Sequence, residues 1–201
     1  MKVPLFPLDI VLFPGTLLPL HIFEPRYKEM IGECLLNQSE FGIVRAQREG
    51  LAVVGCMASI VQVLRRYDDG RMDILCRGHN RFEIEQLDNT RTFLQAEVDF
   101  FDDDGPMSTR QSRQDCLALH FEVLELAGAE DMPMHVNLDA AISFQLAWAL
   151  PSDLGFKQQL LAIRSDAERT ERLSDFYHSI LPKLRIGAGA SRTAHSNGHV
   201  M

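Results

Sequence analysis

Cysteine and histidine are the side chains of this sequence that could most directly bind a metal ion or attack a substrate. The four cysteines are Cys34, Cys56, Cys76 and Cys116, and no two of them form a C-x-x-C pair. This wide spacing excludes zinc ribbons and thioredoxin-type redox sites. Cys76 and His79 form a C-x-x-H pair, which supplies only two of the four ligands that zinc usually takes. We therefore predict no metal site, and we expect the cysteines to be small buried apolar residues.

Sequence motifs of the common enzyme classes are missing. There is no G-x-x-x-x-G-K-[ST] loop for ATP, no G-x-S-x-G nucleophile elbow and no H-E-x-x-H zinc motif. The four lysines, which a Ser–Lys protease would need, are Lys2, Lys28, Lys157 and Lys183. A catalytic lysine must be desolvated, and nothing in these sequence contexts indicates that. We predict no catalytic residue and no cofactor.

Composition narrows the class of protein further. The 201 residues are 46% hydrophobic and 24% charged, which is typical of a globular chain with a real core. The net charge of −8 argues against nucleic acid as the partner. No segment approaches the run of about 20 apolar residues that a membrane span needs. The opening Met1-Lys2-Val3-Pro4 is a poor signal peptide, so we expect a cytoplasmic protein without a membrane partner.

Residues 1–105 read mostly as β-strands with one helix. Pro4, Pro7, Pro14 and Pro19 restrict the opening apolar segments to edge or irregular strands. A helix follows from Glu24-Pro25, because apolar residues then recur on one face. Further strands are expected at Phe41–Ala46, Val53–Leu64, Arg71–Arg77, around Phe82 and Ile84, and at Leu94–Phe100. Asp69-Gly70 predicts a hairpin with a primed turn. Alternating apolar and charged residues favour antiparallel pairing in a closed or nearly closed β-subdomain.

The sequence predicts only helices over residues 106–185, after a connector at 102–106. Ser108-x-x-Gln111 and Ser165-x-x-Glu168 each fit a capping box at a helix start. A helix is expected over Asn137–Leu150, and Pro151-Ser152-Asp153 should end it and cap the next. Short loops predict a small antiparallel bundle. Residues 186–201 are small and polar, so we expect a disordered tail.

Several long motifs resemble the N-terminal substrate-binding domain of Lon proteases. They lie at Pro4–Leu8, Val11–Gly15, Leu18–Met30, Phe41–Val44, Asp69–Arg71, Arg81-Phe82 and Leu150–Leu161. The resemblance implies an α+β fold: a PUA-like antiparallel β pseudo-barrel with one inserted helix, followed by a small helical bundle. It also implies a stand-alone relative of the domain, without the ATPase and protease modules, and therefore a non-catalytic module.

The resemblance implies binding of an unfolded or flexible polypeptide, perhaps as an adaptor. Our candidate apolar contacts are Phe13, Leu17, Leu18, Phe23 and Tyr27, although the same residues would also suit a buried core. Arg26 and Arg81 are candidate polar contacts or structural ion-pair partners. Two other functions stay open: a scaffold that docks one folded protein partner, and a small-molecule pocket built from Cys76, His79 and Arg81.

Overall fold

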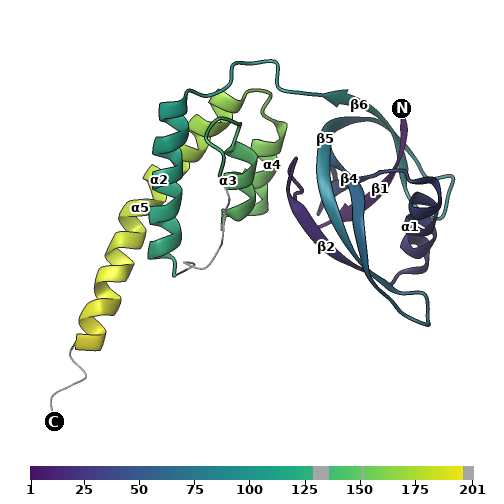
Figure 1. Cartoon of the computed structure of the whole chain (residues 1–201), viewed down its shortest axis with the longest axis horizontal. Coiled ribbons are helices and arrows are strands. Elements are labelled where there is room, and N and C mark those ends of the chain that lie inside the picture. The colour runs from purple at the N-terminus through teal and green to yellow at the C-terminus, as the bar shows by residue number, and fades with distance from the viewer. Residues whose placement is uncertain (129–135, 151, 197–201) are drawn as a thin grey trace, which may run out of the picture.

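The computed structural model describes residues 1–128, 136–150 and 152–196, the last nine as backbone only. It has a β-barrel part and a helical part side by side (Figure 1). The barrel part contains β1 (Lys2–Leu8), β2 (Leu17–Ile22), α1 (Pro25–Asn37), β3 (Phe41–Gln47), β4 (Gly50–Arg66), β5 (Met72–Asp88) and β6 (Gln95–Phe101). The helical part contains α2 (Arg110–Leu126), α3 (Ser143–Ala149), α4 (Leu154–Ala162) and α5 (Asp166–Ser196). The predicted α+β class, with strands first and helices second, is confirmed.

The sheet closes on itself. Its strand order is β2-β5-β4-β3-β1-β6, and β6 also pairs with β5. One edge of the long strand β5 is covered by β4. The other edge is shared, because β2 pairs with residues 72–77 and β6 with residues 81–88. Thus β6 completes the barrel, whereas β2 extends the sheet beside it and pairs with β5 alone among the described strands.

Strand β1 departs from the prediction for proline-rich segments, because it pairs on both sides. Lys2–Pro4 pair antiparallel with β6, and Leu5–Leu8 pair with β3. The partner changes within the strand, so Pro4 and Pro7 each take part in a single ladder. The β1–β3 pair is parallel, while the other strand pairs are antiparallel as predicted. The expectation of an edge strand holds for β2, which contains Pro19.

The β4–β5 hairpin differs in detail from the predicted primed turn. Gly70 has a φ of +82°, but Asp69 has a negative φ. The N–H of Gly70 donates to the Tyr67 carbonyl at 2.9 Å, and the N–H of Tyr67 donates to the Arg71 carbonyl at 2.9 Å. The loop is therefore a four-residue turn, Tyr67–Gly70, whose last residue is the left-handed glycine, another common hairpin connection.

Strand β5 continues through Gly78, where the sequence predicts two separate strands. A Cβ atom at this position would lie 2.2 Å from the Phe13 carbonyl oxygen, so the loop that precedes β2 packs directly on the β5 backbone. The N–H of Gly15 donates to the Gly78 carbonyl at 2.8 Å, and the N–H of Gly78 donates to the Thr16 carbonyl at 2.9 Å. Glycine allows the close approach of the two backbones without interrupting the strand.

Helix starts in the second part agree only partly with the predicted caps. Thr109, not Ser108, caps α2, and the Ser108 hydroxyl instead donates to Asp166. Asp153 caps α4 as predicted, with its carboxylate accepting from the Phe156 N–H at 3.0 Å. Helix α3 begins at Ser143 rather than Asn137.

Helix α5 also differs from the predicted disordered tail, since its backbone continues from Asp166 to Ser196. Residues 197–201 lie outside the described part. None of the helices described here is both long and apolar enough to cross a membrane.

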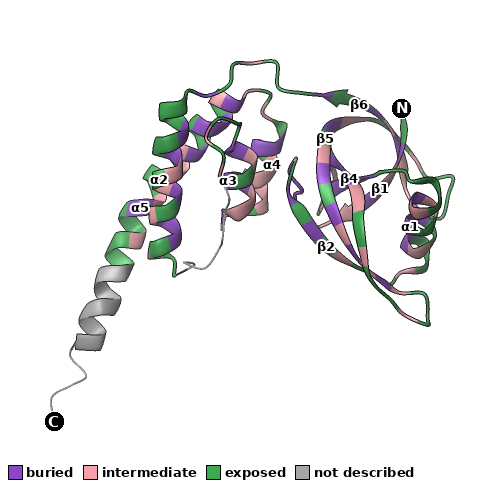
Figure 2. Ribbon diagram, in the orientation of Figure 1, coloured by how far each residue is buried: buried purple, intermediate pink, exposed green. Residues whose placement is uncertain are grey.

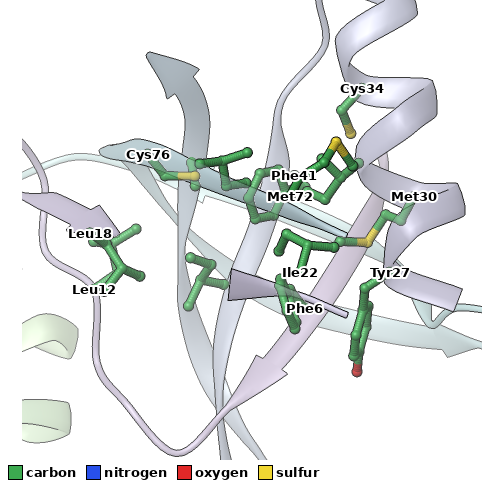
Figure 3. Close-up of a cluster of buried hydrophobic side chains, with 14 of the residues drawn as sticks. Phe6, Leu12, Leu18, Ile22, Tyr27, Met30, Cys34, Phe41, Met72 and Cys76 are labelled. Atoms are coloured by element: carbon green, nitrogen blue, oxygen red, sulfur yellow. The ribbon is translucent and has the colours of Figure 1, made fainter. Parts of the chain in front are cut away.

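The two parts share one of the three hydrophobic clusters. Inside the barrel, side chains from α1, β2 and β5 form a cluster that Figure 3 shows in close-up. The core of the helices also takes in Val11, Phe13, Val54 and Phe101 from the barrel part. Trp148 on α3 packs against both of these clusters. In Figure 1, α3 and α4 face the barrel, while α2 and α5 lie farther out.

Candidate functional site

The two faces of β2 differ sharply in exposure. Figure 2 shows buried and exposed residues alternating along this strand. Leu18 and Ile22 are buried in the barrel, while Leu17, Pro19 and His21 are exposed on the outer face. Phe23 follows the strand, and its ring stacks on that of His21 with 5.9 Å between centroids. We call Leu17, Pro19, His21 and Phe23 the β2 strip.

Two of the five predicted apolar contacts belong to this strip. Leu17 is 42% exposed and Phe23 is 59% exposed. Burial would stabilise the fold by about 25 cal/mol for each Å² of apolar surface removed from water, yet both side chains stay exposed. Exposed apolar side chains gathered along one strand face are typical of an interaction surface.

The other three predicted contacts are core residues. Phe13 is fully buried and packs against Phe144 of α3, with 6.0 Å between ring centroids. Leu18 and Tyr27 lie in the barrel cluster (Figure 3), where the Tyr27 ring is 4.0 Å from that of Phe6. These three side chains are part of the two cores and are not accessible to a partner.

Arginines flank the β2 strip on the neighbouring strands. Arg77 of β5 pairs in register with Leu17, and Arg65 of β4 pairs with Asp73, which in turn pairs with His21. Arg65, Arg66 and Arg77 are exposed. Among the residues described, none of these three forms an ion pair with a carboxylate. In a chain of net charge −8, this edge of the molecule is therefore locally cationic.

A hydrogen-bonded cluster stands at the hairpin end of the strip. The Asp73 carboxylate contacts Nδ1 of His21 at 2.5 Å and accepts from the Tyr67 hydroxyl at 2.8 Å. These hydrogen bonds, from His21 first and then from Tyr67, lower the pKa of Asp73. The hydrogen bond to Asp73 likewise raises the pKa of Tyr67. Asp73 thus fixes the rings of His21 and Tyr67, and hydrogen bonds already satisfy both of its carboxylate oxygens.

A shallow cleft of about 390 Å³ opens beside the strip. Pro19, Leu20 and Ile74 contribute apolar walls, and Leu64 of β4, which is 51% exposed, adds another. His21 and Asp73 also line this cleft, so it is continuous with the hairpin cluster. The cleft can accept an apolar side chain of a segment lying along β2.

Arg81, a predicted polar contact, is a structural residue at the junction of the two parts. It is 3% exposed, and its guanidinium donates to the carbonyl oxygens of Leu161 at 2.9 Å and Ile163 at 2.5 Å. It also forms an ion pair with Asp103, which pairs with Arg169. Arg26, the other predicted polar contact, is exposed and forms an ion pair with Glu24 at 2.8 Å.

Cys76, His79 and Arg81 do not form a shared pocket. Cys76 is buried in the barrel cluster, where desolvation raises its thiol pKa to about 12 (Figure 3). The His79 ring is partly exposed and lies 2.7 Å from the Ser59 hydroxyl, while Arg81 is directed into the junction. A second cleft of about 490 Å³ at the junction is lined by His79 and Arg81, but Cys76 takes no part. Within the described ranges, no three His, Cys, Asp or Glu residues are grouped to hold a metal ion.

Comparison with known proteins identifies the family. The model of the ATP-dependent protease La (LON) substrate-binding domain matches residues 2–182. The chain belongs to this family. Among curated family relatives, the Lon protease of Parabacteroides distasonis is 28% identical over 189 residues, covering 85% of this chain and 23% of the relative. The Lon protease of Roseiflexus castenholzii is 29% identical, covering 93% and 25%. The chain thus spans about a quarter of the length of these relatives.

Solved structures of the family have the same fold. A Lon N-terminal domain protein from Xanthomonas campestris superposes with a TM-score of 0.69 at 26% identity, covering 86% of this chain and 96% of that one. The N-terminal domain of a Mycobacterium avium complex Lon protease gives a TM-score of 0.63 at 19% identity, covering 89% and 98%. The family resemblance drawn from the sequence motifs is confirmed.

Sequence reasoning missed Pro19, His21 and Arg77 as members of the candidate surface. The signal was available in part, because alternate residues of a strand share one face. Leu18, Leu20 and Ile22 are all strongly apolar, whereas the alternate set contains Pro19 and His21. This difference indicates which set faces outward, and our prediction, which took Leu17 and Leu18 together, did not use it.

Proposed function

We propose that this chain is a non-catalytic module that binds unfolded or flexible polypeptide segments on the β2 strip and acts as an adaptor for them. The observation that carries the proposal is the exposure of Leu17 and Phe23 on one strand face, beside an apolar cleft. Membership of a substrate-binding domain family supports the class of ligand. The local arginines add polar contacts at the margin, as in most protein interfaces.

A binding role without catalysis is supported by the state of the nucleophilic side chains. The four cysteines are buried, and desolvation raises the pKa of each. Burial lowers the pKa of Lys157, but its ammonium group donates to the Trp148 carbonyl at 2.8 Å and lies 5.7 Å from the indole ring. Lys157 therefore has a packing role on α4 instead of an exposed reactive one.

Fluorescence anisotropy tests the proposal. The protein is titrated into a labelled polypeptide that is reduced and carboxymethylated so that it stays unfolded, and separately into a labelled RNA of similar size. We expect saturable binding to the polypeptide and none to the RNA. Phe23→Ala should weaken polypeptide binding about fivefold or more, as loss of an interface anchor does.

The matched control is Leu36→Ala, which removes an 83% exposed leucine from α1, away from the strip. It should bind the polypeptide as the original protein does. Equal loss in both variants, or no binding by a folded sample, would contradict the proposal. Specific capture of one folded protein without binding to unfolded chains would instead support the scaffold function.

A further inference from the structure

We propose that the free edge of β2 binds an extended polypeptide segment as an added β-strand, and that the preferred segment carries both apolar and acidic residues on the strand face that it shares with Leu17 and Arg77. This inference rests on the proposed polypeptide-binding function and specifies its geometry and its ligand chemistry. Strand addition to an exposed sheet edge is a general mode of peptide recognition, in which main-chain hydrogen bonds supply affinity.

The backbone of β2 presents alternate groups away from β5. In an antiparallel ladder, hydrogen-bonded and non-hydrogen-bonded pairs alternate. The N–H of Gly78 donates to the Thr16 carbonyl, which places the Thr16–Gly78 pair at a hydrogen-bonded position. By this register, the backbone groups of Leu18, Leu20 and Ile22 form the hydrogen bonds with β5. Leu17, Pro19 and His21 therefore direct their backbone groups to the free edge.

These outward groups have no partner within the described chain. No backbone hydrogen bond involves the N–H or carbonyl of Leu17, Pro19 or His21 outside the β2–β5 ladder. The edge therefore offers two N–H donors, from Leu17 and His21, and three carbonyl acceptors. Pro19 lacks an N–H, a feature that discourages indiscriminate pairing of an edge strand. Six residues of β2 provide a track about 20 Å long.

Side chains on the outer face specify what the segment should carry. Leu17 and Phe23 can pack against apolar residues at alternate positions of the added strand. Arg77 of β5 lies opposite Leu17 on this same outer face. The added strand would lie two strand spacings, about 10 Å, from β5, a distance that an arginine and a glutamate side chain can span together. A carboxylate on that face of the segment would satisfy the Arg77 guanidinium with the bidentate geometry that arginine favours.

A second copy of this chain fits the same edge less well than such a segment. Pairing two β2 strands would bring together two edges that each lack the Pro19 N–H, so hydrogen bonds would be lost on both sides. It would also bring the unpaired arginines of two copies to one interface without supplying a carboxylate for them. Charge complementarity therefore favours an acidic, apolar segment of another polypeptide.

The test uses a labelled nine-residue peptide with valine at its positions 1, 5 and 9, glutamate at positions 3 and 7 and threonine between them, so that valine and glutamate share one strand face. It is titrated against the whole chain. Two analogues carry N-methyl groups on one or the other set of alternate amides. We expect the methylated set that faces β2 to weaken binding more than tenfold, and the other set to have little effect. An analogue with lysine in place of glutamate should also bind more than tenfold more weakly.

Variants of the protein distinguish the contribution of the β2 backbone to peptide binding from that of its side chains. Leu17→Pro removes an outward N–H without removing a β5 hydrogen bond, while Leu17→Ala keeps that N–H. We expect about tenfold weaker peptide binding for Leu17→Pro and a smaller loss for Leu17→Ala. Arg77→Gln should weaken binding severalfold, and the matched control Arg172→Gln, at an exposed arginine of α5, should not. Peptide should also slow hydrogen exchange at the amides of Leu17 and His21.

Each outcome decides between the two proposals. One outcome is that unfolded polypeptide binds, while the two methylated analogues bind equally well and the peptide leaves hydrogen exchange at the His21 amide unchanged. That result overturns strand addition while the binding function stands. If neither unfolded polypeptide nor the peptide binds to folded protein, both fail. Sedimentation that shows a dimer, abolished by Leu17→Pro, would assign the edge to a second copy and overturn the proposed occupant.

Discussion

Arg81 and Arg169 reach the same carboxylate from the two parts of the molecule. Arg81 of β5 donates to Oδ1 of Asp103 at 2.6 Å, and Arg169 of α5 donates to Oδ2 at 2.6 Å. Burial opposes ionisation of Asp103, but the hydrogen bonds and charges of the two arginines outweigh it and hold its pKa below the ordinary value. The connector between barrel and helices is thereby fixed to both.

Replacing Asp103 should destabilise the whole chain. Asp103→Ala leaves two guanidinium groups, 3% and 0% exposed, without their carboxylate. Breaking such a buried ion pair lowers the free energy of unfolding by about 3–5 kcal/mol. Urea unfolding measures this. The control is Glu83→Gln, which breaks an exposed pair with Arg164 and should cost about 0–1 kcal/mol. Equal effects of the two changes would contradict the structural role of the cluster.

Stability should depend on pH through His120. This ring is fully buried against Tyr177, with 2.7 Å between Nδ1 and the hydroxyl, and burial lowers its pKa from 6.5 to about 4. Between these values the unfolded chain binds the proton and the folded chain does not. The free energy of unfolding should therefore fall as pH drops from 6.5 to 4, by about 3 kcal/mol.

His120→Asn tests this prediction, because asparagine keeps a hydrogen-bonding group near Tyr177 but does not titrate. The original protein and the variant are unfolded in urea at pH 7, 5.5 and 4.5. The difference in unfolding free energy between pH 7 and 4.5 should shrink in the variant. An unchanged pH dependence would show that other groups cause it.

Two glycines with different surroundings should respond oppositely to alanine. At Gly78, a Cβ would lie 2.2 Å from the backbone oxygen of Phe13, so Gly78→Ala should cost about 1–3 kcal/mol of stability. At Gly32 in α1, no atom lies within 4 Å of the added Cβ, so Gly32→Ala should stabilise by about 0.5–1 kcal/mol. Thermal unfolding of the two variants checks the signs; a tolerated Gly78→Ala would mean that the preceding loop can move away.

Alanine variants of Leu18 and Phe23 distinguish an effect on stability from an effect on binding. Leu18 is buried in the barrel, so Leu18→Ala should lower the free energy of unfolding by about 2–5 kcal/mol. Phe23 is exposed, so Phe23→Ala should change stability by less than about 0.5 kcal/mol. Chemical denaturation of both variants, beside the anisotropy measurement, gives the comparison. A large stability loss for Phe23→Ala would remove it as a probe of the surface.

The cysteines should be inert until the protein unfolds. Burial raises the pKa of Cys56 and Cys76 to about 12 and that of Cys116 to about 11, so little thiolate exists at neutral pH. Titration with a thiol-specific reagent should label no cysteine in the native protein over the time that labels all four in urea. Fast labelling of one native thiol would indicate local opening around it.

Local patterns predicted most of the elements correctly. The apolar face of α1, the hairpin at Asp69-Gly70 and the Asp153 cap all depend on residues close in sequence, so their signals are visible there. The limits of β5 were not predictable in this way. Glycine at position 78 indicates a break locally, and its actual role depends on the backbone of Phe13, which lies far away in the sequence.

The candidate surface was only partly predictable for the same reason. Leu17 and Leu18 are chemically identical, and their places on opposite faces of β2 make one a surface residue and the other a core residue. The sequence suggests a polar contact role for Arg81, yet its partners, the carbonyls of Leu161 in α4 and of Ile163 just after it, are some eighty positions away. Long-range pairing therefore decided which predicted contacts are accessible.

Barrel closure has a consequence for how this protein is made. The N-terminal amino group of the chain donates to the Val98 carbonyl, 97 positions away, and β1 finds its β6 partner only there. Joining such distant segments costs chain entropy before any contact compensates for it. During synthesis, β1 can pair with β3 as soon as both have been made, but the barrel cannot close until β6 has been translated.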